Sequence, residues 1–451
     1  MAALRRIMIS ARLAVVGTAF FMCGGSLALA CGGGDDTSGA VSTSDAAADG
    51  ATGSSDGGAT PVDSSATGDA NDAGACKLFT PDPTLAAQRA SCAFEAGAPV
   101  SASIESPVAA RAAITHVIVL THENRSVDHL YGTLGHGIDG FSAAYSNPAP
   151  DGGTAFPTHM TTACPADIPH SPAAITAEWD NGKMDGFDIT DGPGSLGYYE
   201  PNDHPFYTWL LQTFATSDRY FCSMMGETGH NRRFLYGASA TQTANNIFTE
   251  MDAAKVTWGN YFAGAQPIYN TYTFPAGSPH LHPYADFLPA LDAGNLPSVT
   301  YLDTPSDEHP PGSILDGESV VYQVLQHAFA SPLWPHLAIV FNYDEGGGFF
   351  DHVNPPPACL PSGAADDAIY NREGFRVPLV MISPYSRKGY VSHVDHSHTS
   401  TLRLIELLYD LPAITNRDAN SDALLDLFDF ECPDFVTPPV LPATPTKGCT
   451  L

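Results

Sequence analysis

Oxygen-bearing side chains follow two apolar stretches of the sequence, each where the stretch ends. The segment HVIVL is soon followed by Glu123 and Asn124, and the segment LAIVFNY runs directly into Asp344 and Glu345. Crowded carboxylates repel one another, and a divalent cation is the usual means of stabilising them. The two segments together therefore predict a cation site with these four side chains as ligands.

Each segment taken alone also has a purely structural explanation. Glu123 would pair with Arg125, and Asp344 would cap the glycine turn that follows it. Because both groups come after strand-like apolar runs, the pair of segments favours the cation site over two unrelated structural roles.

A third candidate lies in the segment GETGHN, where Thr228 stands just ahead of a helical run. Backbone N–H groups and the dipole at a helix N-terminus favour a phosphate there. A threonine hydroxyl becomes a good nucleophile when a cation lowers its pKa. The structural alternative is that Thr228 only caps the helix.

The elements that position these residues alternate between strand and helix patterns. Near-continuous apolar runs of strand length occur at 113–120, 296–302, 337–343 and 377–383, and helical periodicity occurs at 205–218, 319–331 and 398–411. This alternation predicts an α/β fold, a three-layer sandwich with a mostly parallel central sheet. Ligands bind beyond the carboxyl ends of such strands, and Gly/Pro-rich segments at 146–173 and 262–284 are predicted to form long loops over one end of the sheet.

The N-terminal part of the chain has the pattern of an export signal. Arginines precede an apolar stretch, and Ala28-Leu29-Ala30 precedes Cys31, so residues 1–30 are predicted to be a signal peptide. The pattern is compatible both with lipidation of Cys31, which would tether the protein to a membrane, and with simple cleavage after Ala30. Residues 31–75 are predicted to be a disordered stalk, and the protein to be secreted, periplasmic or lipid-anchored at the cell surface.

The composition of the 451-residue chain argues against a polyanionic partner. Without residues 1–30, the chain has 16 basic and 49 acidic residues and a formal charge of −33. Because this charge has the same sign as that of nucleic acid, no nucleic-acid partner is expected. The cysteines lack the spacing of a zinc site, and in an exported chain disulfides are expected. The sequence-local pairs are Cys76 with Cys92 and Cys432 with Cys449, and Cys222 is expected to stay free.

Several segments, in order along residues 113–430, resemble the bacterial phosphoesterase family that includes phospholipases C and acid phosphatases. They are ITHVIVLTHENRSVDHLYGTLG, HSPAAITAEWDNGKMDGF, SDRYFCSMMGETGHNRRFLYGAS, DEHPPGS, NYDEGGGFFDHVNPPP and RVPLVMISPYSRKGYVSHVDHSHTSTLRLIE. The resemblance implies an alkaline-phosphatase-like fold, with a catalytic domain at 110–435 between an N-terminal extension at 76–109 and a C-terminal tail at 436–451.

The resemblance also implies roles for single residues. The metal ligands would be Glu123, Asn124, Thr228, Asp344 and Glu345, and Thr228 would also be the nucleophile. His170 and His309 would contact the phosphoryl oxygens, Asn231 would bind substrate, and a further catalytic histidine would be His282 or His280. His352 and His398 match family motifs too and are interpreted as structural.

The function expected from these residues is metal-dependent hydrolysis of phosphate esters through a phosphothreonine intermediate. The cofactor would be one divalent ion, Ca²⁺, Mg²⁺, Mn²⁺ or Zn²⁺. The substrate would be a phosphate ester or a phospholipid head group, cleaved by a phospholipase C-like phosphodiesterase or an acid phosphatase. The alternative is a non-catalytic surface lipoprotein that binds a cation or a phosphorylated ligand on the same fold.

Overall fold

The computed structural model describes residues 79–105, 107–264, 268, 271–361 and 370–451. They belong to the larger of two compact units, residues 72–451. The predicted signal peptide, stalk and lipidation site at Cys31 lie outside the described residues. Within the described ranges, no helix has both the length and the apolar character needed to cross a bilayer.

The central sheet has eight strands in the order β13-β6-β12-β11-β1-β10-β8-β9. The strands are β1 (His116–His122), β6 (Ala215–Ser217), β8 (Trp258–Phe262), β9 (Leu281–Pro283), β10 (Val299–Asp303), β11 (Leu337–Tyr343), β12 (Leu379–Ile382) and β13 (Val391–Ser392). Only β12 runs antiparallel to its neighbours in this sheet. The predicted mostly parallel sheet is therefore confirmed, and the four predicted strands are β1, β10, β11 and β12.

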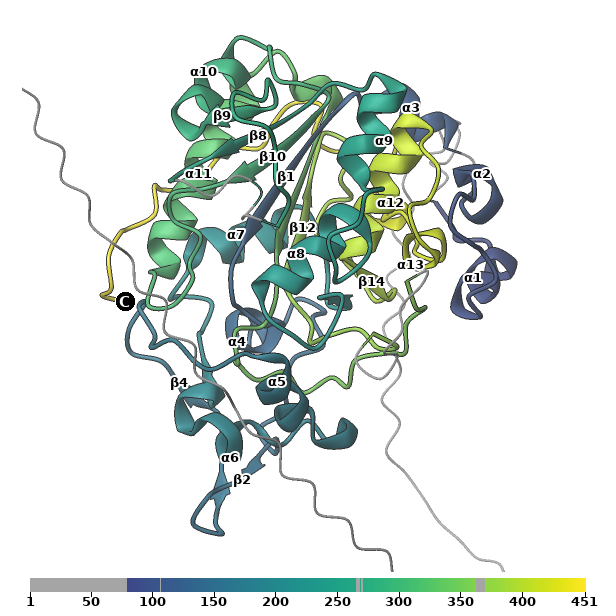
Figure 1. The fold of residues 1–451 in the computed structure, drawn as a ribbon. Helices are drawn as coiled ribbons and strands as arrows, with labels where there is room; N and C mark the ends of the chain where they lie inside the picture. Colours follow the sequence, from purple (N-terminus) through teal and green to yellow (C-terminus); the bar gives the residue numbers. More distant parts are fainter. Residues whose placement is uncertain (1–78, 106, 265–267, 269–270, 362–369) are drawn as a thin grey trace, which may run out of the picture. The chain divides into compact units, whose positions relative to one another are not determined.

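Helices cover both faces of the sheet, which explains why its central strands are apolar throughout (Figure 1). One face carries α7 (Pro205–Thr213), α10 (Phe287–Asp292) and α11 (Ile314–Ala330), and the other carries α3 (Val108–Ala113), α8 (Thr228–Gly237), α9 (Ile247–Ala254) and α12 (His398–Tyr409). The three predicted helices correspond to α7, α11 and α12. The three-layer α/β architecture expected from the sequence is thus confirmed.

Short elements gather beyond the end of the sheet toward which β1 runs, below the sheet in Figure 1. They are α4 (Val127–Tyr131), β2 (Asn147–Pro148), β3 (Thr154–Ala155), β4 (Thr158–His159), α5 (Pro172–Trp179), α6 (Phe187–Asp191) and β5 (Gly197–Tyr198). A separate small core that includes Ile175, Phe187 and Phe350 holds this region together. The segment 146–173 therefore lies over the carboxyl end of the sheet as predicted, whereas 262–284 contributes the edge strand β9.

The remaining elements are short. They are α1 (Pro83–Ala90), α2 (Val100–Ser103), β7 (Tyr220–Phe221), β14 (His396–Ser397), α13 (Asn416–Ala419) and the 3₁₀ turns Asp180–Gly182, Pro193–Leu196, Tyr284–Asp286, Trp334–His336 and Leu425–Leu427. Helices α2 and α3 pack on α12, and Arg403 of α12 donates a hydrogen bond to the hydroxyl of Ser103 at 2.7 Å.

Two disulfides between described cysteines join segments that are distant in sequence. Cys92 is bonded to Cys359, and Cys164 is bonded to Cys449. Both sequence-local pairings, Cys76 with Cys92 and Cys432 with Cys449, are therefore wrong. Sequence proximity is a poor guide here, because the fold brings the end of α1 next to residue 359 and returns the C-terminal tail to the loop at residue 164. Cys222 is free and buried, as predicted.

Candidate active site

The register between the two central strands places the predicted ligands side by side. In the parallel pair of β1 and β11, His122 lies opposite Tyr343. Each strand is followed directly by its acidic residues. The segments after β1 and β11 are joined by the hydrogen bond that the backbone N–H of Arg125 donates to the Glu345 carbonyl at 3.0 Å. The prediction that the two acidic segments meet at one edge of the sheet is confirmed by this register.

The four predicted ligand side chains are almost completely buried. Glu123, Asn124 and Asp344 are 0% exposed and Glu345 is 1% exposed. Asp344 Oδ1 accepts hydrogen bonds from the backbone N–H groups of Asn124 at 3.3 Å and Glu345 at 2.8 Å. Burial raises the pKa of Glu345 well above its usual range, and the neighbouring Asp344 adds to this effect. Two adjacent buried carboxylates are expensive unless positive charge lies near.

The backbone at this site is unusually tight. Asn124 has a φ of 63°, in the left-handed region that asparagine tolerates better than most residues. Gly347, also at a positive φ of 65°, faces it, and a Cβ added there would lie 2.6 Å from the Cβ of Asn124. A glycine is therefore required at position 347, which explains one of the three glycines that follow the acidic pair.

Arg232 is a site residue that the sequence analysis missed. It lies on α8, is 1% exposed, and its guanidinium reaches three carboxylates: Asp344 at 3.1 Å, Asp303 at 3.3 Å and Glu123 at 3.4 Å. Asp303 ends β10, the other neighbour of β1. The helical periodicity of α8 could have indicated this residue, because Arg232 and Arg233 are consecutive and only one of the two side chains can face the sheet.

Arg125 does not pair with Glu123, which was the structural explanation considered for the first segment. Its guanidinium donates to the backbone carbonyls of Asn124 at 2.9 Å and Glu308 at 2.6 Å. The carboxylate of Glu123 contacts Arg232 instead. Arg125 thus fixes the turn after β1 and leaves the Glu123 carboxylate directed toward the shared edge.

Thr228 is the first residue of α8, and its side chain does not act as a helix cap. Glu227 occupies the N-cap position. The hydroxyl of Thr228 donates to Asn124 Oδ1 at 3.4 Å, so it points to the predicted ligand set. The ordered turn before the helix depends on Asn231, whose amide accepts from the N–H of Met224 at 3.1 Å and donates to the carbonyl of Gly226 at 2.8 Å.

Asn231 is buried, and its side-chain amide bonds to the backbone of the turn before α8. In the described geometry it therefore helps to hold this turn, and with it Thr228, in place. Its direct contact with substrate stays a prediction.

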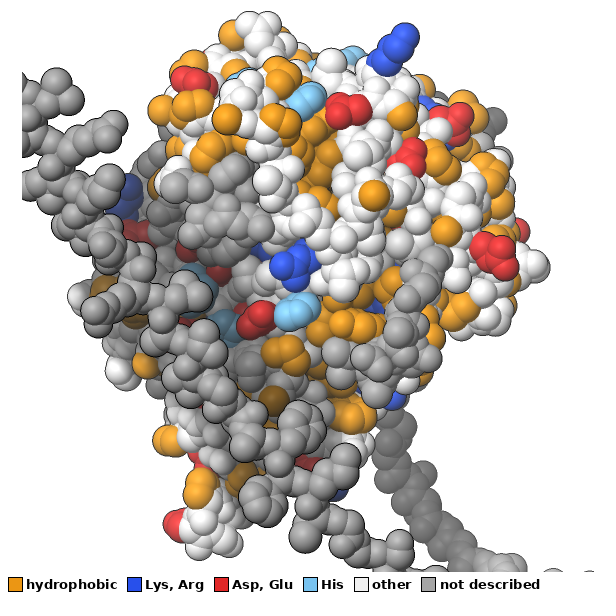
Figure 2. Space-filling model, viewed as in Figure 1, with side chains coloured by type: hydrophobic (Ala, Val, Ile, Leu, Met, Phe, Trp, Pro, Cys, Tyr) orange, Lys and Arg blue, Asp and Glu red, His pale blue; other side chains and the backbone are white. Residues whose placement is uncertain are grey.

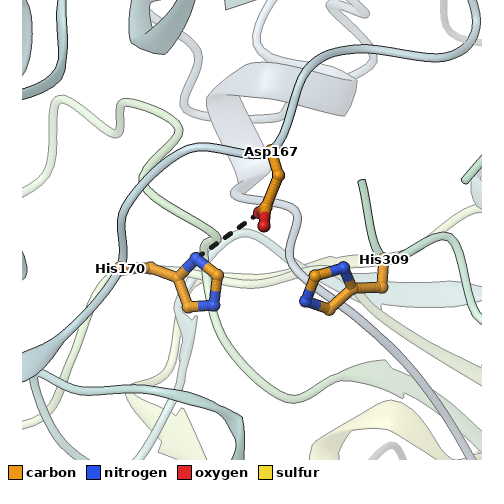
Figure 3. Close-up of side chains that lie close together, drawn as sticks. All are labelled: Asp167, His170 and His309. Carbon is orange, nitrogen blue, oxygen red and sulfur yellow. Dashed lines mark ion pairs between the residues drawn. The ribbon is translucent and has the colours of Figure 1, made fainter. Parts of the chain in front are cut away.

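His170 and His309 are both half-buried and lie close together (Figure 3). Their ring centroids are 5.8 Å apart, and His170 Nε2 is 3.4 Å from the amide nitrogen of Asn124 and 3.6 Å from Glu345 Oε1. The carboxylate of Asp167, 50% exposed, lies 3.9 Å from His170 Nδ1. Asp167 was not among the predicted site residues, because nothing in its sequence context distinguishes it.

The proposed third histidine lies at the outer strands β8 and β9. His282 stacks on Tyr261 with ring centroids 4.7 Å apart, and His280 stacks on Trp258 at 3.9 Å. Two strands, β8 and β10, separate β9 from β1 in the sheet. The stacking contacts of both histidines are with residues of β8, at the β8–β9 edge of the sheet. A catalytic role for either histidine stays a prediction.

The two histidines interpreted as structural occupy packed positions. His398 is buried at the start of α12 and its Nε2 donates to the carbonyl of Tyr343, the last residue of β11, at 3.0 Å. Burial lowers the pKa of His398 to about 4, so the ring is neutral there. His352 Nδ1 lies 2.6 Å from Asp128, whose other oxygen bonds to Arg376 at 3.1 Å.

The ligand set fits a hard divalent cation. The buried guanidinium of Arg232 contacts the carboxylates of Glu123, Asp303 and Asp344. Glu345 adds a fourth buried carboxylate next to Asp344, so these residues together carry an excess of negative charge. Glu345 Oε1 is buried and accepts no hydrogen bond within the described residues. Carboxylate, amide and hydroxyl oxygens are the donors that Ca²⁺, Mg²⁺ and Mn²⁺ prefer.

A cavity of about 460 Å³ lies elsewhere, lined by Arg89, the Cys92–Cys359 disulfide, Glu373 and Arg417 among others. None of the predicted site residues lines it. Its charged groups are paired, as in the 2.9 Å contact between Arg417 and Glu373. Size alone therefore does not mark this cavity as the reactive site.

Comparison with known proteins gives a consistent result. A family model described as the Phosphoesterase family matches residues 114–412. A non-hemolytic phospholipase C of Pseudomonas aeruginosa is 30% identical over 411 residues, which cover 73% of this chain and 59% of that protein. Non-specific phospholipase C6 of Arabidopsis thaliana is 29% identical, over 68% of this chain and 70% of that protein. Phospholipase C B of Mycobacterium tuberculosis is 28% identical, over 71% of this chain and 78% of that protein.

This chain thus spans less than two thirds of the Pseudomonas protein. Among solved structures, a protein in the alkaline phosphatase superfamily from Vibrio parahaemolyticus overlaps with a TM-score of 0.37 at 9% identity, over 77% of this chain and 75% of that chain. At this score we draw nothing further from the overlap. The family model covers more than half of the sequence, and the chain therefore belongs to the Phosphoesterase family, a family of ester-hydrolysing enzymes.

Proposed function

We propose that this protein hydrolyses phosphate esters at the edge of β1 and β11, with Thr228 as the nucleophile. The observation that carries the proposal is the 3.4 Å contact between the Thr228 hydroxyl and Asn124 Oδ1, beside the buried carboxylates of Asp344 and Glu345. A threonine that only capped a helix would turn its oxygen toward the helix N–H groups instead.

The reaction follows from this placement. The Thr228 hydroxyl gives up its proton to solvent and its oxygen attacks phosphorus. The new O–P bond forms as the ester O–P bond breaks, and the leaving alkoxide takes up a proton from solvent. Water then hydrolyses the phosphothreonine and releases phosphate or a phosphomonoester. Because Thr228 is the first residue of α8, the dipole at this helix N-terminus would stabilise the developing negative charge.

A divalent cation would be held by Glu123, Asn124, Thr228, Asp344 and Glu345. When bound, it would supply the positive charge that lowers the pKa of the hydroxyl and offsets the charge of the phosphoryl group. Local charge matters for this protein, because Lys and Arg side chains are few and scattered on the described face shown in Figure 2. The identity of the ion, Ca²⁺, Mg²⁺, Mn²⁺ or Zn²⁺, is a matter for measurement.

His170 and His309 are proposed to act on the phosphoryl oxygens, since His170 contacts Asn124 and the ring of His309 lies 5.8 Å from that of His170. The substrate class is a phosphate ester, and the names of the relatives favour a phospholipid head group cleaved as by a phospholipase C. Such a substrate suits an exported protein, and the proposed location is outside the cytoplasm or at the cell surface. A non-catalytic lipoprotein is the less favoured function, because both the nucleophile and the carboxylates are present.

The test of the nucleophile is the variant Thr228→Ala. We expect turnover to fall by several orders of magnitude while the fold is kept, and Thr228→Ser to retain measurable activity. Thr176→Ala is a matched control, since Thr176 is an exposed threonine on α5 whose hydroxyl, among the described residues, bonds to the Pro172 carbonyl alone. Acid quenching of the wild-type enzyme during turnover should trap phosphate on the peptide 219–232. A folded Thr228→Ala protein with near wild-type turnover would eliminate Thr228 as the nucleophile.

Two substrates separate the proposed activities. Rates on p-nitrophenyl phosphate and p-nitrophenylphosphorylcholine should differ, and a phospholipase C-like enzyme should prefer the choline diester. Exhaustive chelation should abolish both activities, and adding a divalent ion should restore them. Absence of turnover on either substrate in the metal-loaded protein would favour the binding lipoprotein instead.

A further inference from the structure

The loop between β10 and α11, residues 304–313, carries His309 next to a strained residue. Glu308 is 1% exposed, and its backbone has a φ of 72°, in the left-handed region that residues with a side chain disfavour. Strained backbone of this kind persists only where the surrounding contacts enforce it, and it is concentrated at functional sites. The contacts of Glu308 therefore indicate what the strain maintains.

The carboxylate of Glu308 is bound from three elements of the fold. Its Oε1 accepts a hydrogen bond from the hydroxyl of Tyr207 on α7 at 2.5 Å, and its Oε2 accepts one from the hydroxyl of Tyr343 at 2.9 Å. Tyr343 is the last residue of β11. The Nδ1 atom of His122, the last residue of β1, lies 3.1 Å from Oε1. These contacts fix the side chain relative to the two central strands.

A fourth element, α11, leaves room for this carboxylate because it has a glycine there. Gly317 lies near the start of α11, and a Cβ added to it would be 1.9 Å from Glu308 Oε1. The helix therefore packs directly against the carboxylate and limits its movement.

The backbone around Glu308 is bonded to the segment after β1. The guanidinium of Arg125 donates to the Glu308 carbonyl at 2.6 Å, and the backbone N–H of Glu123 donates to the Asp307 carbonyl at 2.7 Å. The loop is thus joined to the ends of both central strands through the Glu308 side chain, and to the segment after β1 through its backbone.

The described hydrogen bonds of His309 lie within its own loop. Its backbone N–H donates to Asp307 Oδ1 at 3.3 Å, and its Nδ1 lies 2.8 Å from the carbonyl of Pro310. Such contacts orient the half-buried ring relative to the loop, whereas the contacts of Glu308 determine where the loop lies.

We propose that Glu308 is the positioning residue for His309. It holds the loop against the ends of β1 and β11, so that the imidazole stays beside His170, which contacts Asn124. Glu308 is buried among its partners and acts through its neighbour, and a displacement of about 1 Å in a reacting group can cost about 100-fold in rate. The consequence for phosphoryl groups rests on the proposed function, whereas the position of the ring does not.

The first test follows the His309 ring without reference to activity. Protein containing ¹⁵N-labelled histidine is examined by NMR, and the ring signals of His309 are identified by their loss in His309→Gln. We expect these signals to shift or broaden in Glu308→Gln, which has one acceptor oxygen instead of two, and in Tyr207→Phe, which lacks the donor. Tyr207→Phe keeps the shape of the ring and should fold even if Glu308→Gln does not.

Matched controls replace the same residue types elsewhere in the core. Glu406 is buried on α12 and pairs with Arg403 at 2.6 Å, and Tyr220 is buried with its hydroxyl 3.0 Å from that of Thr401. Glu406→Gln and Tyr220→Phe should lower stability and leave the His309 signals in place.

The second test measures the binding of inorganic phosphate by calorimetry, in the presence of MgCl₂, in a double-mutant cycle. Glu308→Gln should weaken binding by about 10-fold when His309 is present. In the His309→Gln background the same change should weaken it by less than about 2-fold, because no ring is left to position.

Unchanged His309 signals in both Glu308→Gln and Tyr207→Phe would overturn the positioning role. So would equal shifts in the control variants, or equal losses of phosphate affinity from Glu308→Gln with and without His309. Phosphate binding that is unchanged in His309→Gln would instead contradict the proposed role of His309 at the phosphoryl oxygens, and the ring signals would still decide whether Glu308 positions it.

Discussion

Replacement of Arg232 by glutamine should test how charge is balanced at the site. The guanidinium contacts Asp344, Asp303 and Glu123 at 3.1–3.4 Å, with all of these groups nearly buried. At an effective dielectric constant of about 20, each such contact is worth roughly 5 kcal/mol by Coulomb's law. Desolvation of the guanidinium offsets most of that sum, and breaking a buried pair typically costs about 3–5 kcal/mol.

We therefore expect Arg232→Gln to lower the free energy of unfolding by about 3–5 kcal/mol in metal-depleted protein. Arg233→Gln is the matched control on the same helix, since the one hydrogen bond of its guanidinium within the described residues is to the carbonyl of Ala240 at 3.3 Å, and it should cost less than about 1 kcal/mol. Denaturant unfolding followed by circular dichroism measures both. A saturating divalent ion should stabilise Arg232→Gln more than the wild type, because the ion replaces the lost charge.

Equal losses of stability in the two arginine variants would refute this reasoning. So would an ion-induced stabilisation that is no larger in Arg232→Gln than in the wild type, because the carboxylates would then not depend on the guanidinium for their charge balance.

Three further outcomes follow from particular contacts. Burial alone would lower the pKa of His396, but its two aspartate partners outweigh this effect and raise the pKa to about 10. The protonated ring therefore stabilises the fold fully below pH 6.5, and this stabilisation is lost as the pH rises toward 10. The free energy of unfolding should decline less across that pH interval in His396→Gln than in the wild type. The double variant Cys92→Ser/Cys359→Ser should lose about 2–5 kcal/mol of unfolding free energy, because the bond joins residues 267 apart, and an unchanged denaturation midpoint would contradict this. Gly347→Ala should reduce both stability and phosphate ester hydrolysis, because the added Cβ would clash with Asn124. Gly264→Ala, also at positive φ but with no atom of the described residues within 4 Å of an added Cβ, should cost only the backbone strain.

The acidic ligands were predictable from sequence because each follows directly from a buried strand. The apolar runs before Glu123 and Asp344 identified β1 and β11, and parallel strands bring their carboxyl ends to one edge. No turn of uncertain conformation intervenes between strand and ligand. The positions of these residues therefore required only that the two strands be neighbours.

Arg232 and Asp167 were not predictable in the same way. Arg232 differs from Arg233 only in its rotation about α8, which depends on how that helix packs against the sheet. Asp167 lies in a Gly/Pro-rich loop whose path is set by tertiary contacts, such as the disulfide at Cys164. The short strands β6, β9 and β13 were missed because two or three residues carry too little periodicity to be recognised.

The arrangement of charge explains how so acidic a chain can act on an anionic ester. Three buried carboxylates contact Arg232, and Glu345 adds a fourth next to Asp344, so one guanidinium does not balance the negative charge of these residues. A cation bound there reverses the local sign while the rest of the surface stays negative. On the proposed function, the surplus carboxylates would couple substrate binding to metal binding, and a phosphoryl group would be attracted only to the metal-loaded protein.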